Sequence, residues 1–185
     1  MEKILLYVLL VLILLIIIYF IITFNKFAKA KNKVKEAFAT MDVYLKKRWD
    51  LIPNLVEIVK GYSKHENKTL TEVIKLRNGT YDEMTDENKI STNEKLNTNL
   101  NKLLLLVEKY PELKANNNYL ELSKQLTKAE DEIANSRKYY NATVRDYNNL
   151  IETFPNSIVA KLFRYKKLEM FKAESEEKEN IKVEL

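Results

Sequence analysis

Few residues in this 185-residue chain could carry out chemistry. The chain has no cysteine, which excludes disulfides, thiolate metal sites and cysteine nucleophiles. Its one histidine, His65, excludes any site that needs two imidazoles, and two glycines cannot supply a phosphate-binding loop or a nucleophile elbow. The other acid–base candidates are carboxylates that no spacing pairs, which is typical of solvated helix faces: Glu57, Glu108, Glu130 and Asp131. We therefore expect no enzymatic activity, catalytic residue, metal or cofactor.

Polar residues of another kind form two regular groups. The first lies in the stretch LKKRWDLIPNLVE (45–57), which we interpret as a helix corner where Arg48 and Asp50 bond freed backbone groups. The second recurs at helical spacing inside an apolar seam, which indicates either a buried polar network, the favoured reading, or an exposed recognition stripe. As a candidate surface for a protein partner we take members of both groups: Arg48, Asp50, Asn54, Arg137, Asn141, Arg145 and Asn148.

A third feature is a basic amphipathic segment at 157–167. Its apolar residues are Ile158, Val159, Leu162 and Phe163. Its candidate lipid contacts are Lys161, Arg164, Lys166 and Lys167. Such a segment is typical of contact with anionic lipid, although an extra helix that caps a bundle, with its lysines merely solvated, is the favoured interpretation. The net charge of +5 does not by itself indicate a nucleic-acid partner.

Residues 4–24 carry no charge, glycine or proline, and about 20 apolar residues suffice to cross a bilayer. We predict an uncleaved membrane anchor, because the run is longer than a signal-peptide core even though Ala28-Lys29-Ala30 imitates a cleavage site. Only Lys3, offset by Glu2, precedes the run, whereas five lysines follow it: Lys26, Lys29, Lys31, Lys33 and Lys35. The positive-inside rule then predicts a cell-membrane protein with its N-terminus outside and its C-terminal domain in the cytoplasm.

Apolar residues at steps of three and four predict the helices that position these groups. One helix continues from the anchor, and Asp50 caps a second, with Pro53 in its first turn and Asn78-Gly79 at its end. A third spans 92–110 and a fourth 114–153, with a short helix at 157–165. The predicted fold is all-α: a single N-terminal transmembrane helix, then an antiparallel up-and-down four-helix bundle with a short extra C-terminal helix.

The predicted organisation follows from these helices. A short N-terminal tail covers 1–3, the transmembrane helix 4–24, the bundle 25–154, an amphipathic region 155–172 and an acidic tail 173–185. Because helix directions alternate in such a bundle, the fourth helix returns toward the membrane. This alternation predicts that the segment 157–167 ends near the inner leaflet.

Several motifs resemble the LemA family of bacterial membrane proteins, and together they cover nearly the whole chain. They are FNKF (24–27), the 45–57 stretch, VKGY (59–62), YPELKAN (110–116), the polar stripe from Arg137 to Pro155, and the ending VEL (183–185). The resemblance implies an antiparallel four-helix bundle behind one membrane span. It also implies no established enzymatic activity and no cofactor, so it transfers no catalytic residue to this chain.

Together these features predict a non-enzymatic adaptor or scaffold for other membrane or envelope proteins, in contact with the lipid bilayer and without a nucleic-acid partner. The alternative is a lipid-contacting, membrane-organising protein that acts through 157–167. The sequence makes no prediction of oligomeric state or of the partner's identity.

Overall fold

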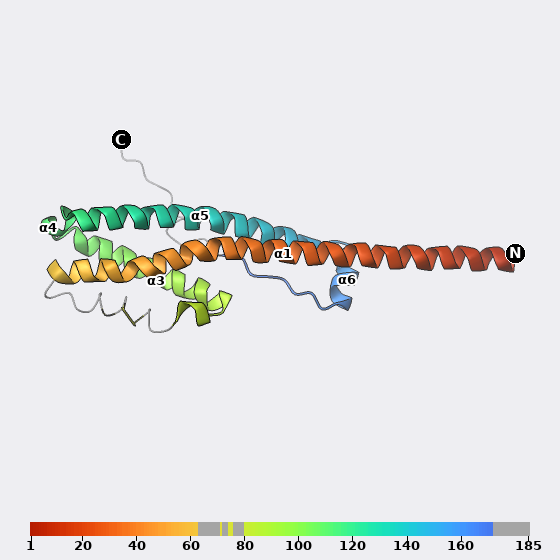
Figure 1. Ribbon diagram of the computed structural model, residues 1–185. Coiled ribbons are helices and arrows are strands. Elements are labelled where there is room, and N and C mark those ends of the chain that lie inside the picture. The colour runs from red at the N-terminus through yellow and green to blue at the C-terminus, as the bar shows by residue number, and fades with distance from the viewer. Residues whose placement is uncertain (63–70, 72–73, 76–79, 172–185) are drawn as a thin grey trace, which may run out of the picture. The chain divides into compact units, whose positions relative to one another are not determined.

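A computed structural model describes residues 1–62, 71, 74–75 and 80–171 of the chain. Its elements are α1 (Glu2–Tyr62), the 3₁₀ helix η1 (Tyr81–Glu83), α3 (Asp86–Val107), α4 (Pro111–Lys114), α5 (Asn117–Glu152) and α6 (Asn156–Leu162) (Figure 1). These residues include no β-strand, which confirms the predicted all-α class.

The chain divides into two compact units. One unit combines Met1–Ala39 with Arg137–Leu185, and therefore holds the start of α1, the end of α5 and α6. The other unit is Thr40–Ser136, and holds the rest of α1, η1, α3, α4 and the start of α5. Each unit is described by itself below.

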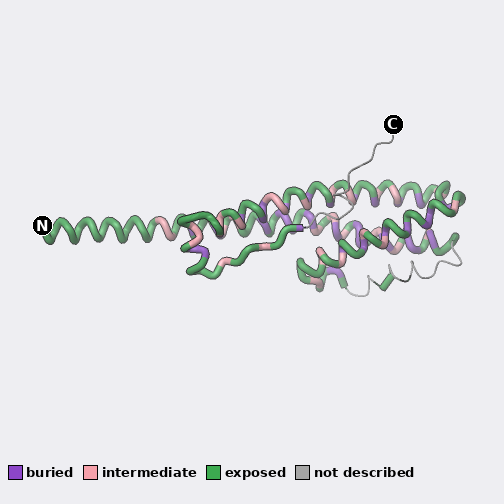
Figure 2. Tube along the Cα trace, turned by 180° about the vertical axis from the view of Figure 1, so that it is seen from behind, coloured by how far each residue is buried: buried purple, intermediate pink, exposed green. Residues whose placement is uncertain are grey.

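The first part of α1 is apolar on every face and exposed on every face. All side chains from Ile4 to Ile18 are exposed, and Figure 2 shows this stretch as exposed along its length. By length and composition it is the one helix of the described residues that is able to cross a membrane. A buried helix of a soluble core would hide these side chains, so the exposure agrees with the predicted anchor. The predicted absence of a break after the anchor is confirmed, because α1 continues to Tyr62.

The predicted helix start at Asp50 is wrong, since α1 passes through Asp50 and Pro53 without interruption. Proline inside a helix cannot donate the usual backbone hydrogen bond, and this costs about 3 kcal/mol. Burial on both sides of Pro53 offsets that cost: one stripe of α1 remains inaccessible before and after it, and comprises Leu45, Trp49, Ile52, Leu55, Val56 and Val59. Tertiary burial therefore outweighs the local signal of proline.

The helix boundaries in the Thr40–Ser136 unit depend on caps. α3 starts at Asp86 rather than at 92, because the Thr85 hydroxyl accepts a hydrogen bond from the Asn88 N–H at 3.3 Å. Asn116 caps the N-terminus of α5: its side-chain oxygen accepts hydrogen bonds from the N–H groups of Asn118 at 2.9 Å and Tyr119 at 3.1 Å. Between these helices Pro111 opens α4, where its missing N–H costs little.

The predicted seam of the long C-terminal helix is buried over most of its length. Nine of its positions lie at 8% exposure or below: Tyr119, Leu122, Leu126, Ala129, Ile133, Ser136, Tyr140, Thr143 and Tyr147. The last predicted position, Phe154, is 80% exposed, because α5 ends at Glu152 and the chain turns there. The predicted short helix is present as α6. His65, the helix end at Asn78-Gly79 and the tail at 173–185 lie outside the described residues.

Replacing Pro53 by alanine should stabilise the protein. Pro53→Ala restores a backbone donor inside α1, and we expect the free energy of unfolding to rise by about 1–3 kcal/mol. Thermal or urea unfolding of the full-length protein in detergent, followed by far-UV circular dichroism, measures the change. Lys47→Ala, at an exposed position of α1, is the control and should stay within about 0.5 kcal/mol of wild type. A loss of stability in Pro53→Ala would contradict the continuous helix.

Candidate functional site

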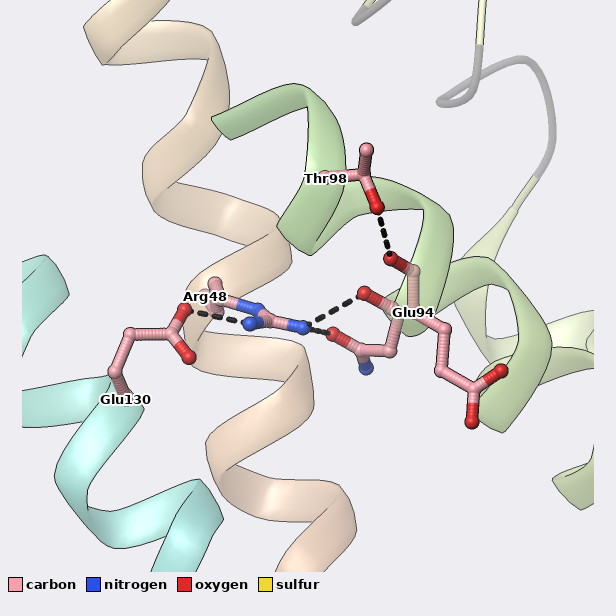
Figure 3. Close-up of polar contacts among 5 residues, drawn as sticks. Arg48, Glu94, Thr98 and Glu130 are labelled. Atoms are coloured by element: carbon pink, nitrogen blue, oxygen red, sulfur yellow. Dashed lines mark hydrogen bonds and ion pairs between the residues drawn. The ribbon is translucent and has the colours of Figure 1, made fainter. Parts of the chain in front are cut away.

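Arg48 is the centre of a polar network inside the Thr40–Ser136 unit. Although it carries a charge, Arg48 is only 3% exposed. Its Nη1 lies 2.5 Å from Oε1 of Glu130 on α5, and its Nη2 donates to the backbone oxygen of Asn93 on α3 at 3.0 Å and to the Asn93 side-chain oxygen (Figure 3). One guanidinium thus joins α1, α3 and α5.

This burial corrects the assignment of Arg48 to a partner surface. An arginine that is almost fully inaccessible cannot meet another protein, and its donors serve other helices of the same unit. The Nε of Arg48 is the buried side-chain polar atom that has no hydrogen-bond partner among the described residues. An unpaired buried donor lowers the stability of the folded state, so the bonds that the two other guanidinium nitrogens make must offset its desolvation.

The other two residues of that predicted group are exposed. Asp50 pairs with Lys46 one helical turn away, at 3.2 Å, and does not fix a corner, because α1 has no corner there. Asn54 lines an open groove of about 370 Å³ on α1 and α5. Leu51 and Ile58 of α1, both half-buried, and the buried Leu122 of α5 give the groove an apolar floor. The remaining lining residues besides Asn54 are polar or acidic: Glu57, Asn118, Glu121 and Gln125.

A second polar cluster in this unit was missed by sequence reasoning. Asp42 of α1 accepts a 2.7 Å hydrogen bond from the Tyr81 hydroxyl and pairs with Lys89 of α3 at 2.7 Å. Lys89 also lies 4.9 Å from the Tyr81 ring centroid, and the Trp49 ring lies 5.4 Å from it. Burial, reinforced by the Asp42 acceptor, raises the pKa of Tyr81 above its ordinary value, so the phenol keeps its proton. The cluster fastens η1 and α3 to α1.

In the other unit, two of the predicted stripe residues hold an extended segment of the chain's own C-terminal region. Asn141 donates to the backbone oxygen of Phe171 at 3.0 Å and accepts from its N–H at 2.9 Å. Asn148 does the same with Leu168, at 2.9 and 3.0 Å. The two asparagines lie seven residues, or two helical turns, apart on α5. We call this pair of double contacts the asparagine clamp.

The remaining stripe residues behave differently from each other. The Arg137 guanidinium lies over the Phe171 ring at 5.2 Å, and Tyr140 meets the same ring edge-on at 5.6 Å, so both bury the end of the clamped segment. Arg145 is exposed. The stripe was predicted to be either a buried network or a recognition surface. Asn141, Asn148 and Arg137 do recognise a peptide segment, but it belongs to the same chain.

α6 packs against the end of the apolar run. Val159 and Ala160 of α6 form a buried cluster with Phe27 of α1, and Tyr19 and Phe20 of α1 cover it. The Tyr19 hydroxyl donates to the side-chain oxygen of Asn156, the first residue of α6, at 3.0 Å. The apolar residues at the other positions of the segment stay exposed: Ile158 at 53%, Leu162 at 64% and Phe163 at 48%. The segment therefore buries one apolar face and leaves a second one open.

The four predicted lipid contacts, Lys161, Arg164, Lys166 and Lys167, are all exposed. Lys167 pairs with Glu152 of α5, whereas Arg164 and Lys166 line a cavity with Tyr147 and Tyr165. Burial raises the pKa of the Tyr147 phenol, so this wall of the cavity is uncharged.

The structure assigns other surroundings to two of the four carboxylates that the sequence singled out. Glu130 is the partner of Arg48, and Glu57 lines the groove. Among the residues that the structure describes, no three histidine, aspartate or glutamate side chains gather as metal ligands would.

An all-helical protein with one helix able to cross a membrane is the class that these features define. The LemA family model matches residues 37–185, and the chain belongs to the LemA family. The match begins after the apolar run, so it rests on the helical part of the chain rather than on hydrophobic composition.

Two relatives extend this finding. Protein LemA of Metamycoplasma hominis is 24% identical over 158 residues, which are 85% of this chain and 72% of that protein. Magnetosome protein MamQ of Magnetospirillum gryphiswaldense is 32% identical over 72 residues, which are 39% of this chain and 26% of that protein. The first similarity covers most of both chains, whereas the second covers a shorter stretch.

Removing the counter-ion of Arg48 should destabilise the helical core. We expect Glu130→Ala to lower the free energy of unfolding by about 1–3 kcal/mol, because the guanidinium stays buried without its charge partner. The loss stays below that of a fully buried pair since the Glu130 side chain is 39% exposed. Denaturant unfolding in detergent measures it, with Asp131→Ala at the next, exposed position as the control. Equal stabilities of the two variants would show that the network contributes nothing.

Proposed function

We propose that this protein is a membrane-anchored, non-enzymatic adaptor that holds other membrane or envelope proteins. The observation that carries the proposal is the continuity of α1, which leads from an exposed apolar run into the helical units without a loop. A segment that crosses a bilayer must satisfy its backbone hydrogen bonds internally, and α1 does so. The polar clusters of both units join helices or hold the chain's own segment, so these polar groups serve binding and support within the protein.

We also propose the finer architecture and orientation. The helical part that follows the apolar run is, in this proposal, an antiparallel up-and-down four-helix bundle. The protein lies in the cell membrane with its N-terminus outside and its helical part in the cytoplasm. The five lysines between Lys26 and Lys35 support this orientation, because positive charge after a span favours the cytoplasmic side.

The partner surface that we propose is the groove on α1 and α5 around Asn54. Arg48 is buried, and Asn141 and Asn148 bond the chain's own segment. Of the exposed members of the predicted surface, Asn54 is the one that lines this groove. Its apolar floor, Leu51 and Ile58, is flanked by the carboxylates Glu57 and Glu121. Such a groove fits a partner helix that offers apolar residues between basic ones.

Filling the groove should release the partner. After crosslinking in membranes and purification of the full-length protein, we expect Asn54→Trp to reduce the recovered partner by about tenfold, because a bulky ring costs a close interface a few kcal/mol. Asn101→Trp makes the same change at an exposed position of α3 that does not line the groove. Both variants should keep the wild-type circular dichroism spectrum. Recovery of the same partners from both would refute the groove as the surface.

A second function is favoured by the surroundings of α6: lipid contact through 157–167, which would make the protein a membrane-organising one. α6 packs on Tyr19, Phe20 and Phe27 at the end of the apolar run, and it leaves Ile158 and Leu162 exposed there. Exposed apolar side chains beside basic ones are typical of a segment that lies in the membrane interface.

A tryptophan placed on α6 should report this contact. In full-length protein reconstituted into vesicles, Trp49→Phe removes the only native tryptophan and Leu162→Trp places a new one on the exposed face. We expect phospholipids brominated on their acyl chains to quench its fluorescence, because the ring lies at the level of the interface. Leu105→Trp, at an exposed position of α3, is the control and should not be quenched. Equal, weak quenching of both would exclude lipid contact by α6.

A further inference from the structure

A cavity of about 390 Å³ opens beside the end of the apolar run. It lies within the unit that contains the start of α1 and the end of the described chain. Three aromatic residues form one part of its wall: Phe24, the last residue of the apolar run, together with Phe163 and Tyr165 from the turn after α6. The Phe24 ring lies 5.1 Å from that of Phe163 and 6.4 Å from that of Tyr165, and Tyr165 stacks on Phe27 at 4.7 Å.

Three cations, Lys31, Arg164 and Lys166, form another part of the wall. None of the residues that line the cavity is acidic. Among the described residues, none of the ion pairs involves one of these three cations. Lys167, by contrast, pairs with Glu152. Three cations that have no acidic partner among the described residues, and that lie beside aromatic rings, are complementary to an anion that is attached to an apolar group.

The position of the cavity along α1 favours the phosphate of a lipid as the anion. Phe24 marks the end of the hydrocarbon-length run, and Lys31 lies two helical turns, about 10 Å, further along the helix. The headgroup layer of a bilayer is about 5–8 Å thick, and a lysine side chain extends back into it. The cavity therefore lies at the level of lipid phosphates if the run spans the bilayer.

The backbone of Arg164 has a conformation that glycine adopts more easily than arginine. Its φ of 56° is in the left-handed region, which glycine adopts at least cost. It stands at the end of α6, where the Tyr165 N–H donates to the Ala160 oxygen at 2.9 Å and the Arg164 N–H to the Lys161 oxygen at 3.2 Å. Glycine is the usual residue at this position of such a helix end. Arginine at this position therefore adds strain to the turn. In return it provides a cationic side chain at the cavity, which glycine would not.

We propose that this cavity binds the headgroup of an anionic phospholipid, with Lys31, Arg164 and Lys166 on the phosphate and Phe24 and Phe163 on the first part of the acyl chains. The proposal rests on the lipid contact proposed above and names its ligand. The lipid source is favoured over a soluble phosphate because the aromatic side of the cavity begins where the apolar run ends.

Photolabelling of the full-length protein tests the proposal. The protein is reconstituted into vesicles of phosphatidylcholine and phosphatidylglycerol, with a photoreactive phosphatidylglycerol as the probe. We expect Arg164→Gly combined with Lys166→Ala to reduce labelling by about tenfold, because two of the three cations that would contact the phosphate directly in the cavity are lost. Lys161→Ala combined with Lys167→Ala removes the same number of charges from the same segment outside the cavity, and should change labelling by less than about twofold.

Two further measurements, the melting temperature and the tryptophan quenching, distinguish failure of the headgroup site from failure of the proposed lipid contact. Arg164→Gly relieves the left-handed backbone, so its melting temperature should stay equal to or above that of wild type, and a loss of labelling then reports the missing side chain. Quenching of the tryptophan at position 162 should persist in both double variants, because it reports lipid contact by α6 rather than headgroup binding. Equal labelling of the two double variants with quenching intact overturns the headgroup site alone. Abolition of labelling by excess inorganic phosphate overturns the choice of a lipid.

Discussion

The unbroken hydrogen-bond ladder of α1 is the constraint on which the rest of the structure depends. A chain that enters hydrocarbon must pair its backbone groups within the segment, so the apolar run is obliged to be helical. No glycine or proline interrupts the chain between that run and Pro53, and at Pro53 the helix loses one bond without ending. The other elements then have to cover one apolar stripe of α1, which cannot bury itself. This stripe includes Phe27 and Val34 and, further along, Leu45 and Ile52. Once α1 is fixed, its exposed apolar faces identify the run at 4–18 as the part that protein does not cover.

Within each unit, polar side chains determine which segments are held together. Apolar stripes permit several rotations of one helix against another, whereas a buried guanidinium restricts the helices to arrangements that give its charge a partner. In the Thr40–Ser136 unit, Arg48 has that role through Glu130 and Asn93. In the other unit, Asn141 and Asn148 each bond both backbone groups of a residue in the extended segment, which fixes its register on α5. These residues carry specificity inside the molecule.

How much could be predicted from the sequence differs between apolar and polar residues. Apolar spacing predicted the buried stripe of α5 from Tyr119 to Tyr147 and the apolar run, because periodicity depends only on neighbours along the helix. Pro53 was misinterpreted because its local preference was outweighed by burial of distant origin. Arg48 was misassigned for the same reason: its partners lie 45 and 82 residues away, and no local pattern reveals them. The stripe at 137–148 was noticed through its spacing, but the spacing did not reveal that it holds the chain's own segment.

The two interpretations of the segment 157–167, packing on the protein and contact with lipid, concern different faces of α6. A helix of seven residues has no independent stability in water, so α6 keeps its shape only through the side it buries. That side consists of Val159 and Ala160, which pack on Phe27 of α1. Ile158 and Leu162 then project from the opposite side because a helix that buries neighbouring positions 159 and 160 must turn 158 and 162 away. Packing of one face on Phe27 therefore leaves a second apolar face exposed beside the apolar run, and the proposed lipid contact through 157–167 requires this packing instead of competing with it.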